Sequence, residues 1–242
     1  MKARFIWRAF KARYRDQRAE IRSLIEAAGP NDIAVDVGAN KGSHILWLSR
    51  AVPYGRVVAF EPQPALADYL RRAVSALNLK NVIIESAAVS DHKGTMSLHI
   101  PCKGDSPGAS LEMAVASREA CRDVEVPVVT LDEYFKDADA RVSAIKVDVE
   151  GHELSVFRGA KEILRRHSPT LVFECENRHI SSGSVFTVLD YLSSFGYDGS
   201  CICRGKLIPI SAFDPAIHQR QQGERFWDQK NYCNNFIMRK KA

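Results

Sequence analysis

Short apolar runs alternate with longer amphipathic segments along most of the chain. Runs of strand type lie at 33–37, 57–60, 81–84, 143–149, 170–173 and 232–238. Apolar residues recur at helical spacing in the segments 43–51, 62–79, 152–165 and 185–195. This rhythm predicts an α/β domain with a doubly wound, mostly parallel sheet and helices on both faces.

Three segments depart from the rhythm. Residues 4–28 have the pattern of one amphipathic helix, which Gly29 and Pro30 end. Residues 92–130 are expected to form an insert with two strand-like runs, at 95–100 and 124–130. The polar stretch 102–122 between them is expected to be a mobile loop that carries acceptor contacts. Residues 197–210, with a turn at Gly205, predict a hairpin, and the last strand is expected to run antiparallel to the others. We therefore expect an N-terminal helix over 1–29 and a single domain over 30–242.

Positive charge is concentrated at the N-terminus. Residues 1–22 hold eight Lys and Arg against Asp16 and Glu20, a net charge of +6, while the whole chain carries +5. The predicted helix could dock on the sheet through its aromatic stripe, cover the cofactor pocket as a lid, bind an acidic acceptor, or contact a membrane surface. No nucleic-acid-binding motif is present, so we expect no nucleic-acid partner.

The remaining composition narrows the class of protein. No apolar run is long enough to span a membrane, and the N-terminus lacks the apolar core of a secretory signal. The six cysteines include no C-x-x-C pair, which argues against a zinc site. A cytoplasmic enzyme with reduced thiols is the expectation.

The most informative stretch is a strand, a glycine turn, a helix and a second strand ending in an acid. The first strand ends at Asp36 and leads into a turn with Gly38 and Gly42, and the second strand ends in Glu61. Gly38 allows a sharp turn close to a ligand, and Gly42 is expected to let the following helix pack near the strand. An acid at that strand tip can accept hydrogen bonds from both ribose hydroxyls of a nucleotide. The loop after the third strand has small residues, which would leave space for the adenine ring. We expect the cofactor to contact the turn, the acid and this loop, namely Asp36, Gly38, Ala39, Asn40, Gly42, Glu61, Pro62, Ala87 and Ala88.

The turn also indicates which nucleotide binds. A dinucleotide motif has a glycine between the two outer ones, making room for a pyrophosphate, whereas this chain has Asn40 there. Asp36 would repel phosphate but would suit a cation. S-adenosylmethionine has a ribose, an adenine and two positive centres but no phosphate, and it fits these residues.

A second cluster of polar residues follows the strand at 143–149. Asp148, Glu150 and His152 come at its carboxyl end. This strand is expected to lie next to the first strand, so that Asp148 borders both donor and acceptor. Glu150 or His152 could take the acceptor's proton, although His152 could instead flank the start of the next helix. Alternatively, carboxylates of the kind that Mg²⁺ accepts could form a metal site from Asp148, Glu150, Glu174 and Glu176.

Taken together, these motifs resemble the FkbM family of S-adenosylmethionine-dependent methyltransferases. The resemblance spans residues 33–176 and is carried by 35–42, 60–62, 87–91 with Gly94, 129–134, 145–153 and 156–160. It implies a seven-stranded class I fold and methyl transfer to oxygen. It also implies an acceptor hydroxyl on a sugar, a glycan or a polyketide-like natural product.

Two other functions stay open at this point. One is an NAD-dependent oxidoreductase, which would need room for the dinucleotide beside Asn40. The other is a non-catalytic module that keeps a methyltransferase fold for binding alone.

Overall fold

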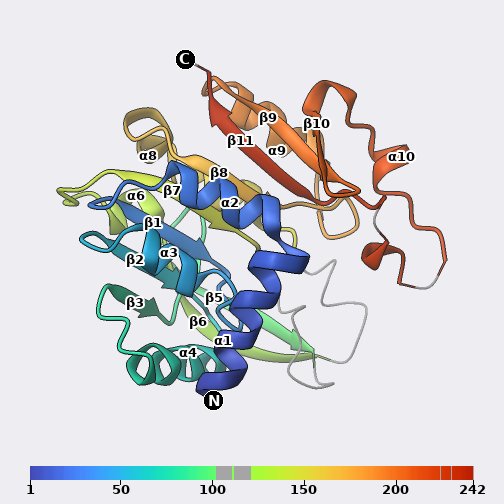
Figure 1. Cartoon of the computed structure of the whole chain (residues 1–242). Coiled ribbons are helices and arrows are strands. Elements are labelled where there is room, and N and C mark those ends of the chain that lie inside the picture. The colour runs from blue at the N-terminus through green and yellow to red at the C-terminus, as the bar shows by residue number, and fades with distance from the viewer. Residues whose placement is uncertain (102–110, 112–120, 224, 230, 242) are drawn as a thin grey trace.

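A twisted sheet forms the middle layer of the computed structural model, which describes residues 1–101, 111, 121–223, 225–229 and 231–241 (Figure 1). Within these residues it has eight strands in the order β10-β9-β11-β8-β7-β1-β2-β3. The parallel part comprises β1 (Ile33–Val37), β2 (Arg56–Phe60), β3 (Val82–Glu85), β7 (Val142–Val147) and β8 (Thr170–Glu174). β1 lies between β2 and β7, so its glycine turn opens at the centre of the sheet.

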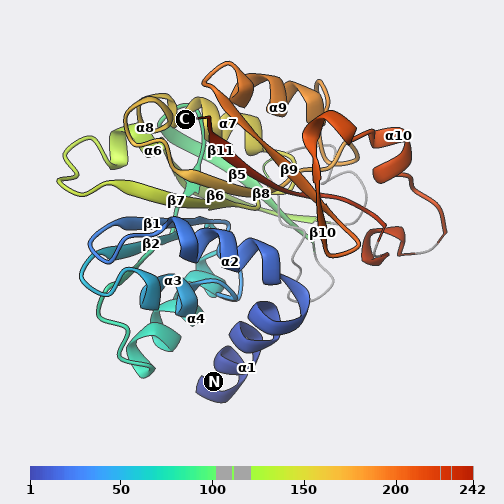
Figure 2. The ribbon, with the colours of Figure 1, turned by 45° about the horizontal axis from the view of Figure 1, so that its top comes forward.

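Helices cover both faces of the sheet (Figure 2). One face packs against α1 (Lys2–Lys11), α2 (Arg18–Ala27), α3 (Ile45–Ala51) and α4 (Pro64–Ala76). The other packs against α6 (Leu131–Tyr134), α7 (Glu153–Arg158), α8 (Lys161–Arg166) and α9 (Val185–Ser193). A short helix, α10 (Pro215–His218), follows β10 and precedes β11 along the chain. These layers confirm the doubly wound α/β arrangement predicted from the strand–helix rhythm, and the class I fold that the family resemblance implies.

The sheet has one more strand than the seven expected. β9 (Tyr197–Cys203) and β10 (Lys206–Pro209) form the predicted hairpin, and β11 (Asn235–Lys240) pairs antiparallel with both β8 and β9. Arg204 and Gly205 both have positive φ, 52° and 72°, which matches the tight turns that fold a chain back on itself. The returning strand β10 therefore joins the sheet edge, and β10 and β11 both run against the parallel strands instead of one strand alone.

The predicted insert forms a small second sheet. β4 (Ala88–Val89), β5 (Gly94–Pro101) and β6 (Cys121–Val129) pair in the order β4-β6-β5. The strand-like runs at 95–100 and 124–130 are thus confirmed. The polar stretch predicted as a mobile acceptor loop lies mostly outside the described residues.

The prediction of one continuous helix over 4–28 is wrong. A π-helical turn (Ala12–Asp16) and Gln17, with φ −131° and ψ 44°, separate α1 from α2. The break lets the two helices bury different surfaces: Phe5 of α1 packs with the cluster between α3 and α4, whereas Leu24 of α2 packs on the sheet. Whether the domain boundary lies at residue 29 stays a prediction.

The helix predicted over 152–165 is likewise two helices, α7 and α8. A Cβ at Gly159, between them, would lie 2.0 Å from the carbonyl oxygen of Ser90. Asp132 accepts hydrogen bonds from the backbone N–H groups of Glu162 and Ile163, both at 3.1 Å, at the start of α8. Gly159 and Asp132 belong to the segments that carried the family resemblance, and both have structural roles here.

Candidate active site

The strands place three charged side chains on one face of the sheet. Asp36 of β1 is paired in register with Lys146 of β7, and β7 lies beside β1 as predicted. Because side chains alternate between faces, Lys146 and Asp148 point to the same side. That side is the one on which α1 to α4 pack.

The backbone N–H groups of the glycine turn already have acceptors within the protein, at the end of β2. The amides of Gly38 and Ala39 both donate to the carbonyl oxygen of Phe60 at 3.0 Å, and the amide of Asn40 donates to Glu61 Oε2 at 2.7 Å. Phosphate-binding turns direct such groups at the ligand. The geometry therefore argues against a pyrophosphate, and so against the NAD alternative.

Gly42 has a different role from the one expected. Instead of allowing the helix to approach the strand, it makes room for side chains from elsewhere: an added Cβ would lie 2.5 Å from Phe5 Cε2 and 2.8 Å from Leu70 Cδ2. The φ of Gly42 is 78°, which also favours glycine. The N-terminal helix α1 thus packs directly beneath the glycine turn.

Glu61 lies at the tip of β2, as predicted, and is buried. Its carboxylate accepts the N–H groups of Asn40 and Gln63, at 2.7 and 2.9 Å. Burial raises the pKa of Glu61 to about 7, although these two hydrogen bonds oppose the change. Each carboxylate oxygen keeps one lone pair, so Glu61 can still accept two hydroxyl donors. Pro62, which follows it, is partly exposed.

A buried lysine, which sequence reasoning did not assign, holds the two aspartates together. Lys146 Nζ lies 2.8 Å from Asp148 Oδ2 and 4.0 Å from Asp36 Oδ1. Burial would lower the pKa of Lys146, but Asp148 and Asp36 outweigh it and raise the pKa. The sequence signal was a lysine within an otherwise apolar, buried strand.

Asp36 leaves negative charge available to a ligand. It is fully buried, and neither carboxylate oxygen has a hydrogen-bond donor within the described part of the chain. Burial raises the pKa of Asp36 to about 6, against the influence of Lys146. Two aspartates around one lysine give this cluster a net negative charge when all three are ionised, which suits a cationic ligand.

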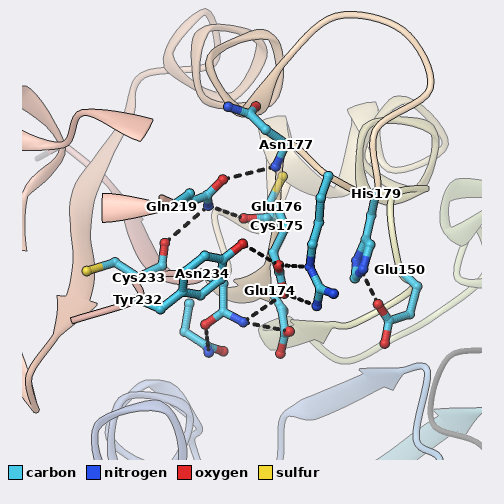
Figure 3. A network of polar contacts seen from close by, with 12 residues as sticks. Glu150, Glu174, Cys175, Glu176, Asn177, His179, Gln219, Tyr232, Cys233 and Asn234 are labelled. Carbon is cyan, nitrogen blue, oxygen red and sulfur yellow. Dashed lines mark hydrogen bonds and ion pairs between the residues drawn. The ribbon is translucent and has the colours of Figure 1, made fainter. Parts of the chain in front are cut away.

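Glu150 and His152, the predicted proton acceptors, have different surroundings. Glu150, with φ 51°, places Oε2 2.7 Å from Nδ1 of His179, a residue that sequence reasoning missed (Figure 3). His152 is buried, and its Nε2 lies 2.9 Å from Ser90 Oγ. The structure thus gives Glu150 a histidine partner and directs His152 toward Ser90 at the end of β4.

Glu174 and Glu176 are joined by residues from the C-terminal strand region (Figure 3). Asn234 Nδ2 donates to both carboxylates, at 2.7 and 3.0 Å, and the Tyr232 hydroxyl donates to Glu176 at 2.6 Å. Burial would raise the pKa of Glu176, but hydrogen bonds from Arg178, Tyr232 and Asn234 reverse this and lower the pKa. Burial and the neighbouring carboxylates raise the pKa of Glu174.

This network bears on the metal alternative. Among the described residues, no three His, Cys, Asp or Glu side chains are arranged so that they could hold a metal ion. Glu176 is instead bound to Arg178, Tyr232 and Asn234. The Mg²⁺ site on Asp148, Glu174 and Glu176 therefore has no support from the geometry.

The predicted adenine-side residues are buried at the edge of the second sheet. Ala87 and Ala88 are 7% and 4% exposed, and Ala88 belongs to β4, where it pairs with Val128. The segment is thus part strand, whereas a loop was expected. Contact with adenine stays a prediction.

Several proteins named as methyltransferases are similar in sequence to this chain. "2-O-methyltransferase NoeI" of Sinorhizobium fredii is 25% identical over 73% of this chain and 76% of its own length. "Hexuronic acid methyltransferase AglP" of Haloferax volcanii is 32% identical over 63% of this chain. "Methyltransferase sdnD" of Sordaria araneosa is 33% identical over 54% of this chain. The matches span 61% of the lengths of both AglP and sdnD.

Solved structures share the fold at low sequence identity. A putative methyltransferase from Streptococcus mutans, SMU.1697c, solved in complex with SAH, superposes with a TM-score of 0.53 at 12% identity, covering 93% of this chain and 97% of that one. The FkbM methyltransferase of Methylobacillus flagellatus superposes with a TM-score of 0.52 at 14% sequence identity. The match covers 98% of this chain and 54% of that one. A family model for the methyltransferase FkbM domain matches residues 36–198, and the chain belongs to this family.

Proposed function

We propose that the protein transfers a methyl group from S-adenosylmethionine to a hydroxyl oxygen of a sugar, glycan or natural product. The observation that carries the proposal is the acidic Asp36–Lys146–Asp148 cluster beside a glycine turn whose amides are already occupied. Such a site favours a cationic nucleoside over a phosphate-bearing one. Family membership and the activities for which NoeI and AglP are named support a methyl donor and a sugar-like acceptor.

Different residues bind different parts of the methyl donor. Glu61 accepts the ribose hydroxyls, Asp36 and Asp148 supply negative charge, and Gly38 and Asn40 shape the turn around the ligand. The bound sulfonium supplies a methyl group that is already electrophilic. The remaining tasks of the protein are to align the acceptor oxygen and to remove its proton.

Glu150 is our candidate for the proton acceptor. It lies two residues beyond Asp148, and His179 at 2.7 Å can stabilise the carboxylate and share its proton. His152 is held by Ser90 in a buried position, which favours a positioning role for it. Asp148, 28% exposed at its side chain, borders the acceptor.

Glu61→Gln is expected to weaken S-adenosylmethionine binding at least tenfold, because the ribose hydroxyls lose a charged acceptor. The wild-type affinity should also rise with pH. Below about pH 7 the raised pKa keeps Glu61 largely protonated, and above it the carboxylate can accept both hydroxyls. Calorimetry from pH 6 to 8 measures both effects. Glu61→Gln has no carboxylate at this position, so any pH dependence that it keeps comes from other groups, including the ligand. An equal pH dependence of the affinity in both proteins would contradict the role of Glu61 as the acceptor of the ribose hydroxyls.

The activity itself is tested with methyl-labelled S-adenosylmethionine and a panel of hexuronic acids, neutral sugars and small alcohols, with and without a chelator. We expect label in a product whose NMR spectrum shows a methoxy group. The chelator arm decides whether a metal is needed. Binding of NADH without binding of S-adenosylmethionine would overturn the proposal, as would label on nitrogen or carbon.

A further inference from the structure

Helix α1 and the π-helical turn after it have two apolar faces, an inner face that is buried and an outer face that is largely exposed. Phe5, Ala9 and Ala12 are at most 4% exposed and form the inner face. On the outer side, Trp7 and Tyr14 are 60% and 61% exposed. A surface helix packed on a core normally has one apolar stripe. Packing on the core therefore does not account for the large exposed area of Trp7 and Tyr14 on the second stripe.

The outer apolar residues at helical spacing are Ile6, Trp7, Phe10 and Tyr14, which we call the outer stripe. All four are exposed, as is Met1 at the start of the helix. The ring centroids of Phe10 and Tyr14 are 5.7 Å apart, and both rings also contact Trp47 of α3, at 5.1 and 5.8 Å. Trp47 Nε1 donates to the carbonyl oxygen of Ala9 at 2.8 Å. This hydrogen bond fixes the Trp47 ring against which Phe10 and Tyr14 pack.

Basic side chains border the outer stripe. Lys2, Arg4 and Arg15 are exposed, and Lys11 and Arg13 lie over the rings of Trp7 and Tyr14 at 5.4 and 5.9 Å. Asp16 is the acidic residue among positions 1–16, and it pairs with Lys11 and Arg15. Lys2 and Arg4 form no ion pair with a carboxylate in the part of the chain that the structure describes. The patch therefore combines exposed apolar area with a strong excess of positive charge.

We infer that α1 binds the surface of an anionic lipid bilayer, with the outer stripe in the headgroup region and the basic residues on anionic headgroups. Trp and Tyr prefer this interface, and basic amphipathic helices lie in its plane. Ile6 and Met1 suit acyl chains better than they suit the stacked bases of a nucleic acid. No helix among the described residues is long and apolar enough to cross a membrane, so the contact is peripheral.

The placement of α1 connects this surface to the active site. Figures 1 and 2 both show α1 along the outside of the molecule, beside α3 and α4. Its inner residue Phe5 packs against Gly42 of the glycine turn. Binding of the outer stripe to a bilayer would therefore hold the glycine turn near the membrane surface, on the other side of α1 from the lipid.

Vesicle sedimentation tests the inference on the full chain. Phosphatidylcholine vesicles containing phosphatidylglycerol should bind the protein, and vesicles of phosphatidylcholine alone should bind it at least tenfold more weakly. Lys2→Glu with Arg4→Glu should reduce binding to the anionic vesicles by at least about tenfold. The matched control, Arg166→Glu with Lys206→Glu, reverses two exposed charges elsewhere and should bind like the wild type.

The apolar part of the contact has its own variants. Trp7→Ser with Tyr14→Ser should reduce vesicle binding several-fold, whereas Tyr54→Ser, at an 80% exposed aromatic elsewhere, should not. Brominated acyl chains should quench tryptophan fluorescence in the wild type. Trp7→Phe should still sediment with vesicles but should lose most of this quenching.

Each alternative partner has a distinguishable result. The inference is wrong if the protein ignores anionic vesicles, or if both charge-reversal variants bind them equally. It is also wrong if α1 variants change only the sedimentation coefficient or only nucleic-acid binding. These experiments measure vesicle binding and not methyl transfer. Their outcome is therefore independent of whether the proposed function is correct.

Discussion

Asp148→Asn is expected to lower kcat at least about 100-fold, because a group bordering donor and acceptor loses its charge. The structure adds a second consequence. Lys146 would lose the carboxylate 2.8 Å away and keep Asp36 at 4.0 Å. A buried charge that loses its partner is costly, so the variant should also unfold at a lower temperature. Rate measurements with saturating donor, made well below the new midpoint, separate the two effects.

Two controls accompany the Asp148 measurement. Asp139→Asn removes a carboxylate at an exposed position and should leave kcat and stability unchanged. Glu150→Gln should lower kcat with a smaller loss of stability, since the partner of Glu150 is His179, whereas Asp148 is the partner of the buried Lys146. If Asp148→Asn kept full activity, Asp148 would have no part in the reaction. If only its stability changed, its role would be structural.

Local patterns were sufficient to predict where the residues at the ends of the neighbouring strands β7, β1 and β2 lie. The turn after β1, Glu61 at the tip of β2 and Asp148 beside the turn all follow from the strand–helix rhythm and from the parallel pairing of β1 with β7. Such placements depend on short-range periodicity and on the rule that parallel strands end at one edge.

Residues whose roles depend on distant parts of the chain were missed or misread. Asn234 and Tyr232 meet Glu174 and Glu176 because β11 inserts between β8 and β9, an order that no local pattern encodes. The break at Gln17 arises because α1 and α2 bury different surfaces, although the sequence is amphipathic throughout. Gly42 was linked to its own helix, whereas its neighbours Phe5 and Leu70 come from other helices.

Gly38→Ala is expected to destabilise the protein by at least about 3 kcal/mol, from two causes. The φ of Gly38 is 77°, in the left-handed region. An added Cβ would also lie 1.9 Å from the carbonyl oxygen of Asp148, so β7 would have to move away from the turn. Urea unfolding measures the loss. Because the displaced backbone carries Asp148, donor binding should fall even under conditions where the variant is folded.

Gly205→Ala is the matched control, since it separates the backbone strain from the close contact. Gly205 has a similar φ, 72°, but an added Cβ there would meet no atom within 4 Å. This variant should therefore lose only about 1–2 kcal/mol, the cost of a left-handed alanine. The difference between the two variants measures how closely β7 approaches the glycine turn. Equal losses would mean that Asp148 does not lie against Gly38, and the proposed arrangement of donor and acceptor around these two strands would be wrong.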